Sequence, residues 1–223
     1  MTDSKTIARG NLVHYHSPNT RSTGTRILLA ELGAAYEMRV LNMKAGEHKE
    51  DGYRAVNPLC KVPAIVHDGA LVTEQGAIFI YLADLFPEAG LAPAIGDPLR
   101  GPYLRWLVYY GSSFEPAVID HWAKHPVSPG TPYGSFDAML STLVAPLRKG
   151  PYLLGEKFSA ADVLIGTAFK WTTGFKVVPE LPEIMEYIGR LYERPAFQRV
   201  TAAEAELAAA HEAAVKAKAE AAP

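Results

Sequence analysis

The chain has 223 residues, of which 48% are hydrophobic, so it is long enough to bury one large core or two smaller ones. Its 22 basic and 24 acidic residues give a formal net charge of -2, which argues against nucleic acid or an anionic membrane surface as a partner. The single cysteine, Cys60, excludes an internal disulfide and a thiolate metal cluster, and because no apolar run suits a signal peptide or a membrane span, we expect a cytoplasmic protein.

The amino-terminal residues predict a strand, a helix and a second strand. The run 11–16 is rich in strand formers and is followed by a Ser-Pro-Asn turn at 17–19. A helix over 22–33 comes next, with aliphatic residues at helical spacing and a glycine at its end. Residues 36–41 alternate like a strand. Because a helix connects the two strands, they should be parallel.

The segment 62–73 predicts a hairpin, in which two short apolar runs flank an Asp-Gly turn. It follows a polar stretch, 44–57, that we interpret as one short irregular helix. An apolar helix over 76–86 ends at a proline and completes a βαβ-ββα order. This is the order of the thioredoxin fold, and Pro63 opens the third strand where that fold places a cis proline.

The remainder predicts helices only, after a linker rich in proline and glycine. The helical segments are 99–122, 135–148, 159–173 and 182–192, with a shorter run from Pro195. The stretch from Thr201 to Pro223 is mostly Ala, Glu and Lys, so we expect a solvated helical tail that buries no face. The expected parts are a thioredoxin-like domain at 10–86, a linker at 87–97, an all-helical domain at 98–203 and the tail at 204–223.

Two further patterns are interpreted as structural. Ser159 and Asp162 form a capping box before an apolar helix, so Asp162→Ala should cost about 1 kcal/mol of stability and leave chemistry unchanged. His14 and His16 alternate on the first strand without a partner at metal-ligand spacing. We therefore expect no metal site.

The run NPLCKVPAIVHDGALVTEQGAIFIYLADLFP, Asn57 to Pro87, closely resembles the glutathione-binding half of cytosolic glutathione transferases. The all-helical remainder resembles their second domain, and the likeness covers residues 10–200. The resemblance implies an α/β plus all-α protein, in which a thioredoxin-like βαβ-ββα domain precedes a C-terminal helical bundle. It indicates a bacterial member of a serine-type or atypical subclass.

The resemblance also implies a glutathione site. A cis peptide before Pro63 turns the N–H and C=O of Val62 outward, so the cysteinyl unit of glutathione can pair with them as an added strand. Glu74 and Gln75 start a helix, whose positive end attracts the γ-glutamyl carboxylate, while the Glu74 carboxylate suits the ammonium group. The alternatives without ligand binding are that Glu74 is an ordinary acidic residue at a helix start and that Lys61 is a solvated lysine. The expected glutathione-binding residues are Ser17, Lys61, Val62, Pro63, Glu74 and Gln75.

Catalysis by such a protein requires the glutathione thiolate. Lowering a thiol pKa of about 8.5 by two units takes roughly 2.7 kcal/mol of preferential stabilisation of the anion. A helix N-terminus plus one hydroxyl or amide donor can supply this. Family members use Tyr, Ser or Cys in the first turn, but here Tyr15 lies in the strand and Cys60 precedes the proline loop as a small filler. The first candidate for the activating residue is Ser22 at the helix start, followed by Thr20 and Asn19, and a plain helix cap is the alternative role of Ser22.

The helix predicted over 99–122 offers a candidate site for the second substrate. Gly111 and Pro116 should bend this helix, because Pro116 cannot donate a hydrogen bond to the carbonyl of Ser112. A bent helix can form one wall of an apolar pocket, although the apolar spacing also suits core packing. The expected lining residues are Tyr109, Tyr110, Phe114, His121 and Trp122.

The leading hypothesis is a glutathione transferase that conjugates or reduces hydrophobic electrophiles, with glutathione as co-substrate and no metal. A non-catalytic protein of the same fold that binds glutathione or a hydrophobic ligand is the alternative. The resemblance further implies a homodimer, whereas the charge balance opposes nucleic acid as a partner.

Overall fold

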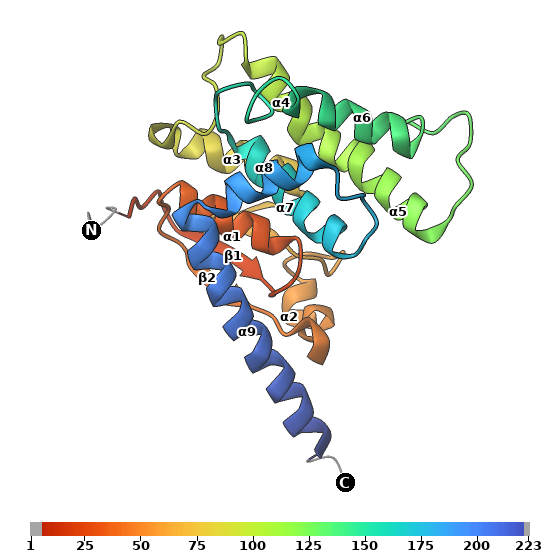
Figure 1. The fold of residues 1–223 in the computed structure, drawn as a ribbon. Coiled ribbons are helices and arrows are strands. Elements are labelled where there is room, and N and C mark those ends of the chain that lie inside the picture. The colour runs from red at the N-terminus through yellow and green to blue at the C-terminus, as the bar shows by residue number, and fades with distance from the viewer. Residues whose placement is uncertain (1–5, 221–223) are drawn as a thin grey trace. The chain divides into compact units, whose positions relative to one another are not determined.

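The computed structural model describes residues 6–220, which group into two compact units (Figure 1). The chain up to Glu74 groups with the carboxy-terminal helix that begins at Pro195, and residues 75–194 form the second unit. An α/β domain with a thioredoxin-like order and a helical domain are therefore present, as the sequence predicted. The domain boundaries stay a prediction. Within the described residues, no helix is both long enough and apolar enough to cross a membrane.

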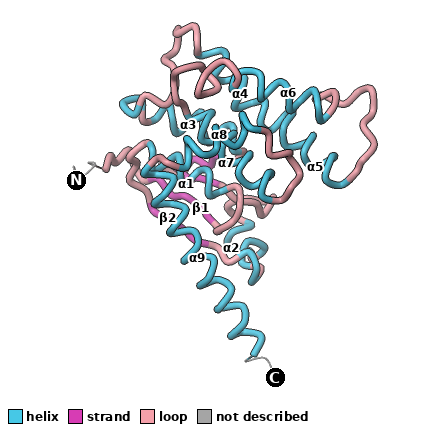
Figure 2. Tube along the Cα trace, viewed as in Figure 1, coloured by secondary structure: helices cyan, strands magenta, loops and turns pink. Residues whose placement is uncertain are grey.

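The first unit is built on a mixed four-stranded sheet with the order β2-β1-β3-β4, drawn in magenta in Figure 2. The central strands are β1 (Leu12–His16), which is buried along its whole length, and β3 (Ala64–His67). The edges are β2 (Glu37–Val40) and β4 (Ala70–Val72). β1 pairs in parallel with β2 and antiparallel with β3, which pairs antiparallel with β4. The predicted strand order and hairpin are confirmed.

Helices complete the connections of this unit. α1 (Ser22–Glu31) joins β1 to β2 and buries its aliphatic side chains. Between β2 and β3 the chain forms two 3-10 turns, Met43–Ala45 and Glu47–Lys49, and the short helix α2 (Asp51–Arg54). The sequence predicted one irregular helix here. Gly46 interrupts it, because a φ of 88° belongs to the left-handed region that glycine adopts at little cost.

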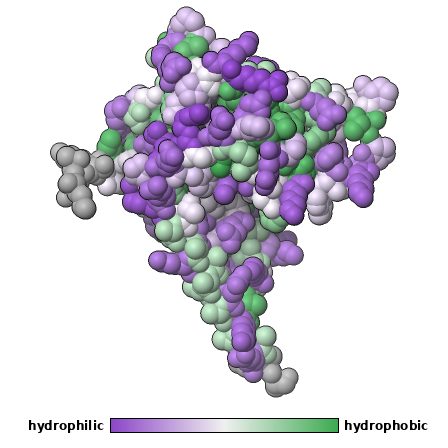
Figure 3. All heavy atoms as spheres, in the orientation of Figure 1, coloured by the Kyte–Doolittle hydropathy of each residue, from purple (hydrophilic) through white to green (hydrophobic). Residues whose placement is uncertain are grey.

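The last helix, α9 (Pro195–Glu220), runs beside α1 and is longer than predicted (Figure 1). The side chains of Phe197, Val200 and Glu204 are buried. The expected solvated tail is therefore wrong at Glu204, which is only 4% exposed. Farther along α9, hydrophilic side chains alternate with small apolar ones on the surface (Figure 3).

The second unit is helical. Its elements are α3 (Gln75–Leu85), the 3-10 turn Pro87–Ala89, α4 (Arg100–Tyr109), α5 (Glu115–Ala123), α6 (Phe136–Leu147), α7 (Ala160–Gly174) and α8 (Pro182–Tyr192). α7 is the core helix of the unit and contacts α3, α4 and α8. Gly166 allows α8 to approach closely, since a Cβ atom there would lie 2.0 Å from the side chain of Leu191.

The long helix predicted over 99–122 is interrupted by a π-helical segment, Tyr110–Phe114, between α4 and α5. Pro116 follows this segment in the first turn of α5. Because proline has no N–H to donate, the regular hydrogen bonding of an α-helix cannot pass through this position. A wider turn before the proline absorbs the mismatch, and such segments are frequent at functional sites.

The predicted capping box at the start of α7 is present. The Asp162 carboxylate accepts hydrogen bonds from the N–H of Ser159 at 2.8 Å and the N–H of Leu153 at 2.9 Å. It also accepts from the hydroxyls of Ser159 and Tyr187, each at 2.9 Å. Burial of this carboxyl group raises its pKa to about 6 despite these four donors.

Candidate active site

The loop before β3 contains the cis peptide bond between Val62 and Pro63, as the sequence predicted. Both residues are buried, whereas Lys61 is exposed. The carbonyl oxygen of Lys61 accepts hydrogen bonds from the side chains of Tyr53, at 2.5 Å, and Asn57, at 2.8 Å. These contacts fix the backbone of the loop while the Lys61 side chain extends outward. The Lys61 ammonium group is therefore accessible from solvent while the backbone of the loop stays fixed.

Glu74 ends the amino-terminal segment of the first unit with an exposed side chain and a left-handed backbone, φ 63°. This conformation is uncommon for a residue other than glycine, and such strain is typical of functional sites. In the second unit, Gln75 begins α3, and its side-chain oxygen accepts a hydrogen bond from the Tyr110 hydroxyl at 2.8 Å. A contact of Gln75 with glutathione would therefore use its backbone N–H, since the first N–H groups of a helix have no acceptor within the helix.

The turn between β1 and α1 gathers three of the predicted hydroxyl residues. The Thr20 hydroxyl donates to the carbonyl of Ser17 at 2.7 Å, and its oxygen lies 2.7 Å from the oxygen of Ser22. The Ser22 oxygen accepts a hydrogen bond from the N–H of Ser17 at 3.1 Å. Ser22 is fully buried, Thr20 is half-buried and Asn19 is exposed in the left-handed conformation, φ 56°. Of the hydroxyls of Thr20 and Ser22, that of Thr20 is therefore the more accessible to a ligand.

Two residues that the sequence did not assign to the site, His16 and Glu204, connect to this turn through Ser22. The Ser22 oxygen is 2.8 Å from Nδ1 of His16, and Nε2 of the same imidazole is 2.9 Å from Oε1 of Glu204. The Glu204 carboxylate also accepts a hydrogen bond from the Thr23 hydroxyl and one from Arg26 Nη1, each at 2.7 Å. No sequence signal joins Glu204 to His16, because they are far apart in the chain and Glu204 sits in a run of Ala and Glu.

Electrostatics in this cluster favour an ionised Glu204. Burial raises the pKa of the carboxyl group, but the hydrogen bonds from His16, Thr23 and Arg26 outweigh burial and lower the pKa to about 2. The neighbouring His14 is also buried, and its ring centroid lies 5.5 Å from that of His16. Burial, reinforced by the nearby His16, lowers the His14 pKa well below its usual value.

The residues predicted to line the second-substrate pocket lie in the second unit and differ in burial. Tyr110 and Phe114 are buried and stack on each other with ring centroids 5.9 Å apart, so they contribute to the core. The Tyr109 hydroxyl donates to the carbonyl of Met139 at 3.2 Å. Trp122 is 69% exposed. His121 stacks on the ring of Phe136 and lines a cavity.

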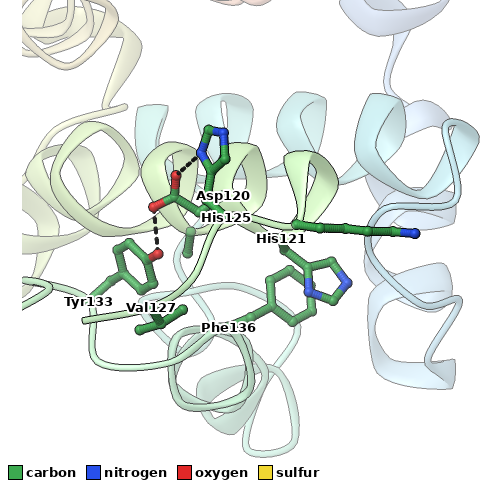
Figure 4. Close-up of a pocket in the computed structure, with 8 residues that line it drawn as sticks. Asp120, His121, His125, Val127, Tyr133 and Phe136 are labelled. Atoms are coloured by element: carbon green, nitrogen blue, oxygen red, sulfur yellow. Dashed lines mark hydrogen bonds and ion pairs between the residues drawn. The ribbon is translucent and has the colours of Figure 1, made fainter. Parts of the chain in front are cut away.

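This cavity of about 340 Å³ lies between α5, α6 and the loop that joins them (Figure 4). Asp120 is its polar centre, because the carboxylate accepts a hydrogen bond from the Tyr133 hydroxyl at 2.6 Å and lies 3.0 Å from His125 Nδ1. The Tyr133 and His125 hydrogen bonds lower the Asp120 pKa. The cavity is lined by Ala117, Asp120, His121, Lys124, His125, Val127, Tyr133 and Phe136. Within residues 6–220, no group of three or more His, Cys, Asp or Glu side chains is arranged to hold a metal ion.

Two protein-family models match parts of this chain. Residues 11–84 match "Glutathione S-transferase, N-terminal domain", and residues 135–195 match "Glutathione S-transferase, C-terminal domain". A relative from Escherichia coli O157:H7, glutathione S-transferase GstA, is 28% identical over 201 residues, which cover 85% of this chain and 97% of the relative.

Solved structures agree with these matches. A glutathione transferase from Methylococcus capsulatus is 30% identical with a TM-score of 0.75, and the alignment covers 87% of this chain and 98% of that one. A sphingomonad glutathione S-transferase in complex with glutathione is 29% identical with a TM-score of 0.73, covering 86% and 98% of the two chains.

Proposed function

This chain belongs to the glutathione S-transferase family, and from that premise we propose that it is an enzyme that conjugates or reduces hydrophobic electrophiles with the thiolate of glutathione. The observation that carries the proposal is the hydroxyl cluster in the turn before α1, with Thr20 half-buried at its accessible end. A hydroxyl at a helix N-terminus can stabilise a thiolate by a hydrogen bond and by the helix dipole together.

Glutathione would bind the first unit along the loop that precedes β3. The backbone of Val62 would pair with the cysteinyl unit, and the exposed ammonium group of Lys61 would bind the glycyl carboxylate. The exposed carboxylate of Glu74 would bind the γ-glutamyl ammonium group. Ser17, Pro63 and the backbone N–H of Gln75 complete the proposed set.

The nature of the second substrate follows from general chemistry. A thiolate attacks an electrophilic carbon or a peroxide oxygen, and orientation by the protein accelerates the attack. We assign the binding site of this second substrate to the second unit. His121 and Trp122, whose side chains are exposed, are the candidates for contact with it. We further propose a cytoplasmic homodimer, by analogy with the family alone.

The test is a titration of bound glutathione, in which the ultraviolet absorbance of the thiolate is followed against pH. We compare the wild type with Thr20→Val, Ser22→Ala and Asn19→Ala, and measure binding of glutathione in parallel by calorimetry. Loss of the activating group should raise the pKa of the bound thiol by about one to two units and leave binding largely intact.

The same titration separates the enzyme from a non-catalytic ligand-binding protein. A ligand-binding protein would bind glutathione with the thiol pKa near its solution value of about 8.5. If the wild type lowers the thiol pKa but none of the three variants changes it, the assignment of the activating residues is wrong.

A further inference from the structure

A continuous chain of polar groups leads from the turn before α1 into the interior of the first unit. The Thr20 and Ser22 oxygens are 2.7 Å apart, and Ser22 is 2.8 Å from Nδ1 of His16. Nε2 of His16 is 2.9 Å from Glu204. Thr20 is half-buried, whereas Ser22 and His16 are fully buried. The chain therefore connects the half-buried hydroxyl of Thr20 with the buried carboxylate of Glu204.

The contacts of Glu204 determine where the imidazole carries its proton. An ionised carboxylate only accepts hydrogen bonds, so Nε2 of His16 must be the protonated nitrogen that faces it. In the neutral imidazole, Nδ1 then holds a lone pair directed at the Ser22 hydroxyl. Arg26 already balances the charge of Glu204 at 2.7 Å. The cluster is thus neutral with a neutral His16 and can accept one positive charge.

We propose that His16 takes up the proton of the glutathione thiol through the hydroxyls of Thr20 and Ser22, and that Glu204 holds the resulting imidazolium. This inference rests on the proposed function, because it requires glutathione sulfur beside Thr20. His16 does not touch the sulfur, so it is a positioning residue that stores a proton.

The transfer balances without any further reactant. The S–H bond breaks, sulfur keeps the electron pair, and the proton passes to the Thr20 oxygen. The Thr20 hydroxyl, which donates to the carbonyl of Ser17 in the absence of ligand, turns and releases its own proton to the Ser22 oxygen 2.7 Å away, and Ser22 releases its proton to Nδ1 of His16 at 2.8 Å. The products are a thiolate and an imidazolium, so the net charge of the site is unchanged. Each hydroxyl ends with one hydrogen, as it began.

The ionisable groups around His16 leave it as the group that accepts the proton. Glu204 and Arg26 are paired with each other, as an anion and a cation. The ring of His14 faces His16, but its lowered pKa keeps it neutral. Tyr36, whose ring centroid is 6.0 Å from that of His14, has a pKa raised by burial and also stays neutral.

The experiment counts protons. Glutathione is titrated into the full-length protein at neutral pH by calorimetry in two buffers of different ionisation enthalpy, which gives the number of protons released on binding. Ultraviolet absorbance gives the number of thiolates formed on the same sample. If His16 stores the proton, the wild type forms thiolate while releasing far less than one proton per thiolate. Release of one full proton per thiolate overturns the proposal.

Two variants test whether His16 is the group that accepts the thiol proton. In His16→Asn, which cannot take up a proton, thiolate that still forms should be accompanied by one released proton, and the pKa of the bound thiol should rise by about one unit or more. Thr20→Val interrupts the relay and leaves the His16 and Glu204 pair in place, so it should give the same result in a folded protein. Thr25→Val removes a different buried hydroxyl of α1 and should behave as the wild type. Wild-type behaviour of both His16→Asn and Thr20→Val would contradict the relay.

The outcomes distinguish this inference from the function on which it rests. If no heat of glutathione binding is observed, the proposed function fails and the relay fails with it. If glutathione binds without thiolate formation, the protein is a non-catalytic binder and the relay is wrong. If thiolate forms with full proton release to solvent, the transferase function stands and only the relay is refuted.

Discussion

Replacement of Glu204 by alanine tests whether the carboxy-terminal helix holds the first unit together. The substitution removes the acceptor of two hydrogen bonds, from the Thr23 hydroxyl and the Arg26 guanidinium, and the carboxylate that lies 2.9 Å from Nε2 of His16. All three belong to β1 or α1, so α9 loses its polar attachment to both elements. The sequence alone predicts no effect, because the residue falls in a stretch expected to be solvated.

The structure predicts a large loss of stability. Removing one partner of a buried ion pair costs about 3–5 kcal/mol. The lower end applies here, about 3 kcal/mol, since the Arg26 side chain is 15% exposed and can regain contact with water. Glu204→Gln keeps the shape and an acceptor for Thr23, so we expect it to cost about 1–2 kcal/mol.

Urea unfolding followed by circular dichroism measures both effects, with Glu206→Ala as a matched control on the exposed face of α9. The pH dependence gives a second readout. The Glu204 pKa of about 2 lies below the ordinary 4.5, so its stabilisation is present above pH 4.5 and is lost as the pH falls toward 2. Glu204→Ala should lack that part of the acid destabilisation. Equal stability of Glu204→Ala and Glu206→Ala would refute the assigned role of Glu204.

Three further predictions concern the second unit. Asp162→Ala leaves buried donors of Leu153, Ser159 and Tyr187 without their acceptor, so urea unfolding should show a loss of about 2–4 kcal/mol, above the roughly 1 kcal/mol of a simple cap. Because burial raises the Asp162 pKa to about 6 from 3.8, the wild type should lose about 3 kcal/mol as the pH rises from 4 to 6. Asp162→Asn should lack this loss, and an unchanged pH profile in that variant would contradict the assignment. Gly166→Ala should cost about 1–3 kcal/mol through its clash with Leu191, and strict additivity with Leu191→Ala in unfolding measurements would exclude that cause.

Local pattern was enough to predict most elements of the first unit. Strand-forming residues in β1, alternation in β2, helical spacing in α1 and the Asp-Gly turn between β3 and β4 all depend on neighbours in the chain, and the structure confirms these elements. The cis peptide bond before Pro63 could not be predicted from neighbouring residues. It was predicted because Pro63 opens the third strand, where the thioredoxin fold places a cis proline. The interruption of the helix at Tyr110–Phe114 could be expected at Pro116, but not its π-helical form.

The candidate site was predicted less completely, for a physical reason. Ser22, Thr20 and Ser17 are close in sequence, so one turn brings them together. His16 and Glu204 meet only when α9 docks on the sheet and α1, and composition favours a solvated role for a glutamate among alanines. Spacing also could not separate core aromatic residues from pocket residues, and Tyr110 and Phe114 proved to be buried.

The return of α9 to the first unit has a consequence for biosynthesis. Strands β1 to β4 are complete when residue 72 has been made, yet the carboxylate that pairs with Arg26 and His16 arrives only at residue 204. At a translation rate of about 5–20 residues per second, this leaves the nascent first unit without its closing helix for on the order of ten seconds. During that interval the face of α1 that α9 later covers is open to chaperones, and a chain truncated before residue 204 would lack the carboxylate that completes the first unit.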